Sequence, residues 1–139
     1  MNRATLLLSL AIALSSAACR SDPPPPERRP VVRWRTVGSW LGHGDKQTES
    51  FTSDSGGFRV RWAATNETRP GAGRLRVVFR SGDSGREIIE AIDAHGAGGG
   101  TEEVAADKPR WYYLTIESAD EDWTVDVDER IEGTVKGSR

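Results

Sequence analysis

The feature that most constrains the fold of this chain is a repeated alternation of apolar and polar residues. The alternation is clean in four short runs, at 58–62, 75–79, 112–116 and 123–127. Successive side chains of a strand point to opposite faces of a sheet, so each run can turn one apolar face to a core. Clusters of Gly, Asp, Ser and Pro separate the runs and favour turns. The pattern therefore predicts short β-strands joined by tight loops.

The same pattern predicts the fold class. Clean alternation is typical of antiparallel sheets with one solvated face, and further strands are expected at 32–40 and 49–53. Two such sheets bury their apolar faces by stacking on each other. We expect an all-β domain, an antiparallel β-sandwich of about seven or eight strands with jelly-roll or Ig-like topology. A closed barrel is the alternative. Trp62 and Trp123 are in phase with the apolar residues of their runs and are expected in the core.

The segment 85–96 has two interpretations. Ser84 and Glu87 have the spacing of a helix capping box, and the three isoleucines of the segment fall on one helical stripe. The segment nevertheless lies among strands, and tertiary context often overrides local propensity. We favour a strand and keep the helix as the alternative.

The N-terminal residues have the layout of a secretory signal. Arg3 precedes an apolar run at 4–14, and small residues follow up to Ala18. The run is shorter than the roughly 20 residues that span a bilayer, and it lacks the polar face of a core helix. We therefore predict a signal peptide at 1–18.

Cys19 is the only cysteine of the chain and directly follows these small residues. The site resembles a bacterial lipobox, although Ser16 stands where lipoboxes usually carry an aliphatic residue. An exported domain with disulfides would have an even cysteine count, so lipidation gives this residue a role. We predict a lipid anchor at Cys19 that makes the membrane of the bacterial cell envelope a partner, with free secretion as the alternative. Arg20 in place of an Asp favours the outer membrane if the organism is Gram-negative.

The rest of the chain divides into three parts. Residues 19–31 include four consecutive prolines, which favour an extended, semi-rigid stalk. Residues 32–130 are predicted to form the sandwich, roughly one hundred residues and enough for one domain. Residues 131–139 are expected to be a C-terminal tail.

The charges of the chain exclude one class of partner. The formal net charge is −2, and a domain that binds nucleic acid would be markedly basic, so no nucleic-acid partner is expected. Arginines and carboxylates occupy outward positions of neighbouring strands, which predicts cross-strand ion pairs. An arginine patch for an acidic glycan or lipid head group is the alternative, and it requires arginines without neighbouring carboxylates. The residues are Arg59, Arg61, Arg74, Arg76, Arg80, Glu117, Asp126 and Asp128.

No catalytic set stands out among the polar residues. His43 and His95 lack metal-ligand spacing, and 53–57 has a serine without a convincing base and is typical of a turn. The glycine run 96–100 lacks the strand–loop–helix context of a phosphate cradle and is expected to be a flexible loop. The acidic residues 120–122 make calcium an alternative, since loop carboxylates are its usual ligands. We expect a protein that is not an enzyme and uses no metal and no cofactor, with a hydrolase that has an unfamiliar site as an alternative.

Trp111 and Tyr113 are the candidate ligand-binding residues. They alternate with Tyr112 and Leu114 and therefore lie on the opposite face of their run. On a wet face they would form an exposed aromatic pair that can stack on sugar rings or anchor a protein partner. Cover by a neighbouring loop or by the chain ends is the alternative. We expect a binding or structural module with an envelope protein or a glycan as partner, and a carbohydrate-binding module as the alternative function.

Several of these patterns together resemble a family. The chain resembles small uncharacterised bacterial lipoproteins and exported proteins with a single β-sandwich domain. It is more remotely similar to the jelly-roll modules of secreted peptidases and to carbohydrate-binding modules. The resemblance implies the fold and implies no catalytic residues. It rests on Trp40-x-Gly42-x-Gly44, on Phe51, and on the runs 58–62, 111–116 and 123–127.

Overall fold

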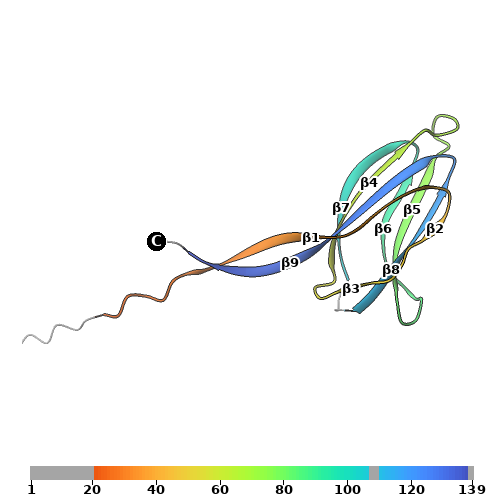
Figure 1. Cartoon of the computed structure of the whole chain (residues 1–139). Helices are drawn as coiled ribbons and strands as arrows, with labels where there is room; N and C mark the ends of the chain where they lie inside the picture. Colours follow the sequence, from red (N-terminus) through yellow and green to blue (C-terminus); the bar gives the residue numbers. More distant parts are fainter. Residues whose placement is uncertain (1–20, 107–109, 138–139) are drawn as a thin grey trace, which may run out of the picture.

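The alternating runs form strands whose apolar sides face each other between two antiparallel sheets (Figure 1). The computed structural model describes residues 21–106 and 110–137. The first sheet has the order β1 (Arg28–His43), β9 (Asp122–Lys136), β4 (Gly57–Thr65) and β7 (Gly98–Ala105). The second has β8 (Arg110–Ala119), β5 (Arg74–Ser81) and β6 (Glu87–His95), with β2 (Lys46–Gln47) and β3 (Phe51–Ser53) both paired to β8. The predicted all-β antiparallel sandwich is confirmed.

The strand order identifies the topology. β2 and β3 pair with successive parts of β8 and act as one interrupted strand. Counted in this way, each sheet has four strands, in the orders β1-β9-β4-β7 and β2/β3-β8-β5-β6. This is the winding of a jelly roll. The interruption explains why the described residues form nine strands where about seven or eight were expected, and the two separate sheets exclude the closed barrel.

The core is dominated by aromatic rings and aliphatic side chains from both sheets. The Phe58 ring of β4 stacks on the Phe79 ring of β5, with centroids 4.6 Å apart. Tyr112 meets Phe58 edge-on at 5.2 Å. Trp123 is buried as expected, whereas Trp62 is only half-buried and packs at the margin of the core. The alternating residues with almost no exposed surface are Phe58, Val60, Leu75, Val77, Phe79, Tyr112, Leu114, Ile116, Trp123, Val125 and Val127.

The ambiguous segment is the strand β6, so the strand interpretation is confirmed and the helix is wrong. Its pairing with β5 shifts register twice, which leaves Ala91 and Ile88 as extra residues. Each extra residue is a β-bulge that moves the following side chain to the other face. Ile92 and Ile89, three apart in sequence, therefore pair with Val77 and Phe79 on one face of β5. The bulges thus allow isoleucines with a helix-like spacing in the sequence to lie on one face of a strand.

β1 and β9 continue beyond the sandwich as a two-stranded ribbon, which carries both described chain ends away from the other strands (Figure 1). Their pairing, interrupted by one irregularity at Val37, runs on to Arg28 opposite Lys136. Residues 28–31, assigned to the proline-rich linker, and 131–136, assigned to the tail, are therefore strand residues. Pro30 fits because β1 is an edge strand that pairs only with β9. The predicted signal peptide and Cys19 lie outside the described residues. Within the part of the chain that the structure describes, no helix is long and apolar enough to cross a membrane.

Candidate functional site

β8 turns Trp111 and Tyr113 to the outer side of the second sheet, since Tyr112 and Leu114 point into the core. The Trp111 side chain is 53% exposed. Tyr113 is half-buried, and its hydroxyl lies at the β5–β6 turn, 3.3 Å from the point that a Cβ on Gly85 would occupy. Trp111 is thus accessible to a ligand, while the turn covers part of Tyr113.

A shallow groove of about 440 Å³ begins beside Trp111, between the edges of the two sheets. Its lining combines the aromatic residues Trp111 and Phe51 with the hydroxyl-bearing residues Thr36, Ser50 and Thr52 and with Arg35. An aromatic face with a few polar groups is the usual composition of a small-ligand site. Tyr113 does not line this groove. The lining residues are Arg35, Thr36, Val37, Ser50, Phe51, Thr52 and Trp111.

A buried carboxylate holds Arg35 at the rim of the groove. Glu129 of β9 has no exposed surface, and its side chain accepts hydrogen bonds from the Ser53 hydroxyl at 2.7 Å and from a guanidinium nitrogen of Arg35. The backbone N–H groups of Asp54 and Ser55 donate to it at 2.7 and 3.2 Å. Burial favours the neutral acid, but these hydrogen bonds outweigh it and lower the pKa of Glu129. Ser53 therefore serves to position a carboxylate, and its hydroxyl is not a free nucleophile.

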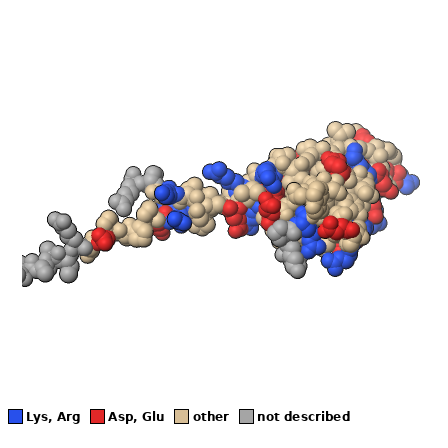
Figure 2. Space-filling view, turned by 60° about the horizontal axis from the view of Figure 1, so that its bottom comes forward, with Lys and Arg blue, Asp and Glu red and all other residues tan. Residues whose placement is uncertain are grey.

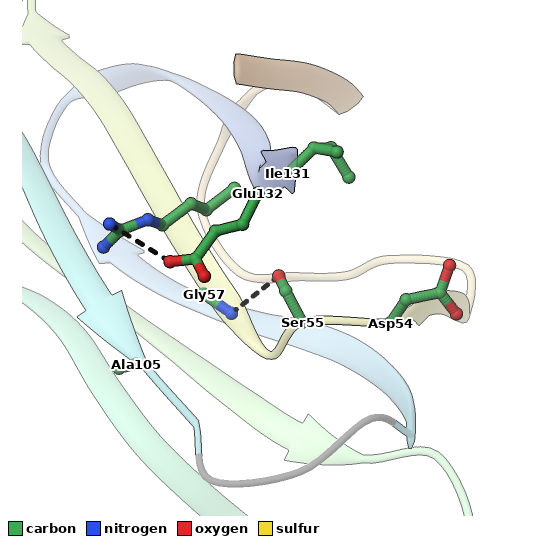
Figure 3. Close-up of a pocket in the computed structure, with 7 residues that line it drawn as sticks. Asp54, Ser55, Gly57, Ala105, Ile131 and Glu132 are labelled. Atoms are coloured by element: carbon green, nitrogen blue, oxygen red, sulfur yellow. Dashed lines mark hydrogen bonds and ion pairs between the residues drawn. The ribbon is translucent and has the colours of Figure 1, made fainter. Parts of the chain in front are cut away.

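A second groove of about 510 Å³ lies where the ribbon leaves the sandwich (Figure 3). Arg130 and Glu132, both on β9, form a 3.2 Å ion pair in its wall, and the Gly57 N–H donates to the Ser55 hydroxyl at 3.1 Å. The described residues that line it include no histidine and no cysteine. Four of the lining residues thus contact one another in two pairs, and we assign no chemistry to this groove. The lining residues are Asp54, Ser55, Gly57, Ala105, Arg130, Ile131 and Glu132.

The outward arginines of the first sheet contact carboxylates. Arg59 and Arg61 both contact Asp128, at 2.7 and 3.2 Å, and Thr36 donates to the same carboxylate at 3.1 Å. These groups cover Asp128 so that it is only 2% exposed. The guanidinium group of Arg59 also lies 4.5 Å from the ring centroid of Trp34, within the range of a cation–π contact.

The second sheet has a similar arrangement centred on Arg76. Its guanidinium group contacts Glu90 at 2.6 Å, Glu87 at 3.2 Å and Glu117 at 3.4 Å. The predicted cross-strand pairing is confirmed, and the alternative of arginines without neighbouring carboxylates is wrong. Figure 2 shows the result as basic and acidic residues intermixed over the visible surface. Two longer contacts, each of 3.8 Å, join Arg74 to Asp93 and Arg80 to Glu87.

The two histidines each lie beside a different aspartate. Nδ1 of His43 is 2.9 Å from Asp122, and Nε2 of His95 is 3.8 Å from Asp93. Among the described residues, no group of three or more His, Cys, Asp or Glu side chains could hold a metal ion. The loop acids 120–122 do not converge, since Asp120 accepts from Thr68 and Asp122 is bound by His43 and Asn66.

The glycine run 96–100 was expected to be a loop, which is wrong for its last three residues; residues 96–97 form the bend between β6 and β7. Gly98 to Gly100 belong to β7 and pair with β4. The indole nitrogen of Trp62 lies 3.1 Å from the point that a Cβ on Gly100 would occupy. A residue without a side chain lets the Trp62 ring lie against this edge strand.

The buried positions of two glutamates were not predicted from the sequence. Glu129 follows Trp123, Val125 and Val127 in the same alternation, so its inward position could have been predicted from its phase. Glu121 is also fully buried, although its place in an acidic turn suggested a solvated carboxylate. Its burial depends on the neighbouring loops, for which the sequence carries no local signal.

Comparison with known protein families and with curated proteins found no match to this chain.

Proposed function

We propose that this protein is a lipid-anchored, non-enzymatic binding or structural module of the bacterial cell envelope, with the outer membrane favoured in a Gram-negative organism. The observation that carries the proposal is Cys19, the single cysteine, placed directly after an apolar run and small residues. A lipid-modified cysteine binds membrane through buried methylene groups, each worth about 0.8 kcal/mol, and more than one acyl chain makes the anchor stable.

The arrangement of the domain is compatible with such an anchor. Arg28 begins β1 at the far end of the ribbon from the sandwich (Figure 1). Eight residues, 20–27, lie between it and Cys19, and they include the four consecutive prolines. An extended proline-rich segment rises about 3.1 Å per residue. Stalk and ribbon together would hold the Trp111 groove away from the lipid surface.

Metabolic labelling with a fatty-acid probe tests the anchor. The full chain is expected to take up label in bacterial cells, and Cys19→Ala is expected to lose it. Ser21→Ala, which changes a neighbouring residue and keeps the cysteine, serves as the matched control. Equal labelling of the wild type and Cys19→Ala would rule out Cys19 as the lipid-modified residue.

A carbohydrate-binding module is the second candidate function, favoured by the exposed Trp111 beside a groove with hydroxyl and guanidinium groups. Sugar rings stack on an exposed aromatic side chain, and their hydroxyl groups form hydrogen bonds with polar side chains of the groove. Glycan-array binding is expected to weaken in Trp111→Ala and to persist in Leu41→Ala, which removes an exposed apolar side chain that does not line the groove. Absence of any glycan signal for the folded wild type would count against this function without affecting the anchor.

A further inference from the structure

At the end of the sandwich opposite the ribbon, a carboxyl group lies buried without a partner. Glu121, in the turn between β8 and β9, has no exposed surface. Neither of its carboxyl oxygens has a hydrogen-bond partner among the described residues. A buried ionised carboxylate with no counter-charge is very costly, and such a group usually takes up a proton.

A second carboxyl group approaches from the loop between β4 and β5. Oε2 of Glu67 accepts hydrogen bonds from the backbone N–H groups of Gly71 and Gly73, both at 3.2 Å. Oε2 of Glu121 lies 1.9 Å, and Oε2 of Glu67 3.2 Å, from the point that a Cβ on Gly73 would occupy. The two carboxyl groups therefore converge over Gly73, whose missing side chain leaves them room.

Most of the other charged groups around this end have partners of their own, and Arg69, in the loop that carries Glu67, has no ion pair among the described residues. In the same turn, Asp120 accepts from the Thr68 hydroxyl, and Asp122 from Asn66 and His43. Across the neighbouring loops, Asp45 accepts from the Ser118 N–H, while Arg74 and His95 both face Asp93. Among the described residues, neither Glu67 nor Glu121 has an ion pair with a cationic side chain.

We propose that Glu121 and Glu67 share one proton, with the neutral carboxyl group of Glu121 donating to the carboxylate of Glu67. The roles follow from the donors, because two backbone N–H groups stabilise the ionised form of Glu67 and none reaches Glu121. The proton supplies Glu121 with a partner and joins the β8–β9 turn to the β4–β5 loop. Loss of the proton to solvent leaves two like charges in contact and loosens this end of the sandwich.

The pair makes stability depend on pH in a defined direction. Burial, and then the charge of Glu67, raise the pKa of Glu121. The contribution of the pair to folding stability is fully present when the pH is below the ordinary glutamate pKa, roughly 4.3. It is lost as the pH rises through the raised pKa, because the folded state then has to release a proton that it binds more tightly than the unfolded chain does.

Thermal unfolding of the full chain in detergent, followed by tryptophan fluorescence between pH 5 and 9, tests the proposal. Glu121→Gln replaces the acid by an amide that can still donate to Glu67. Its melting temperature is expected to match the wild type at low pH and to exceed it by about 5 °C at high pH. Glu132→Gln, on the exposed ribbon, is the control and is expected to follow the wild type. Identical pH profiles for the wild type and Glu121→Gln would overturn the shared proton.

Two further measurements keep the outcome decisive. If Glu121→Gln does not fold, Glu67→Gln takes its place; removing the neighbouring charge should move the midpoint of the alkaline loss to lower pH, and an unchanged midpoint would contradict the proposal. Calcium ions, added to chelator-treated protein at high pH, should leave the melting temperature unchanged. If calcium raised the melting temperature of the wild type and not that of Glu121→Gln, the two glutamates would form a cation site, and the shared proton would be ruled out.

Discussion

Arg35 of β1 and Glu129 of β9 face each other in the strand register, and the exposed guanidinium group of Arg35 donates to the buried carboxylate of Glu129. This contact joins the rim of the Trp111 groove to the base of the ribbon. The β3–β4 turn depends on the same carboxylate, because three of its donors come from Ser53, Asp54 and Ser55.

Glu129→Ala is expected to destabilise the domain by about 3 kcal/mol, because it leaves buried donors of the β3–β4 turn without an acceptor. Urea unfolding followed by tryptophan fluorescence measures this change. Glu132→Ala removes an exposed glutamate from the same strand and should change the free energy of unfolding by less than about 0.5 kcal/mol. Equal effects of the two substitutions would contradict the role given to Glu129.

The free energy of unfolding is expected to fall in acid as Asp128 and Glu129 take up protons. Burial opposes ionisation of Asp128, but hydrogen bonds from Arg59 and Thr36 and the nearby arginine charges outweigh it and lower its pKa. The stability from both groups is present above their ordinary pKa values, roughly 3.9 and 4.3, and is lost as the pH falls through the lowered ones.

Urea titrations between pH 7 and pH 2 check this acid dependence. Asp128→Asn should lower the free energy of unfolding at pH 7 and should lose less of it on acidification than the wild type does. Asp126→Asn, at a half-buried neighbouring position of β9, is the control. If the free energy of unfolding of Asp128→Asn fell with pH as steeply as that of the wild type, protonation of Asp128 would not account for the loss of stability in acid.

Phe58→Ala is expected to cost about 3–5 kcal/mol, because it opens a cavity where three aromatic rings meet. Leu41→Ala, at a side chain that is 74% exposed, should stay within about 0.5 kcal/mol of the wild type. Guanidinium unfolding compares the two, and a small loss in Phe58→Ala would mean that the aromatic cluster contributes little to the core.

Gly42→Ala is expected to destabilise the fold by about 1–3 kcal/mol, since its Cβ would lie 2.8 Å from the buried ring of Trp123. Gly133→Ala is the matched control on the paired strand β9, where the nearest atom, of Val31, is 3.9 Å away. Differential scanning calorimetry should show a lowered melting temperature for the first variant alone. A neutral Gly42→Ala would mean that the indole ring can move aside.

Sequence periodicity was sufficient to predict which residues of a strand face the core, and it was insufficient to predict which strands pair. Leu75, Val77 and Phe79 were assigned inward because the side-chain period of a strand is two, and they are buried. The ribbon was missed because the pairing of Arg28 with Lys136 joins residues from the two ends of the chain. No local pattern records such a contact.

Side chains at the candidate site show the same division. Exposure of Trp111 follows from its phase opposite the core residue Tyr112. Partial cover of Tyr113 depends on the position of the β5–β6 turn at Gly85, which is a tertiary property. The bulges at Ala91 and Ile88 likewise arise from pairing with β5, so the sequence alone left a strand and a helix open.

The central claim, that Cys19 carries a lipid anchor, is tested most directly by mass spectrometry of the N-terminal peptide of the full chain after expression in bacterial cells. We predict a peptide that begins at Cys19 and carries the added mass of acyl chains. A peptide that begins at Cys19 or at a later residue without acyl mass would contradict the claim.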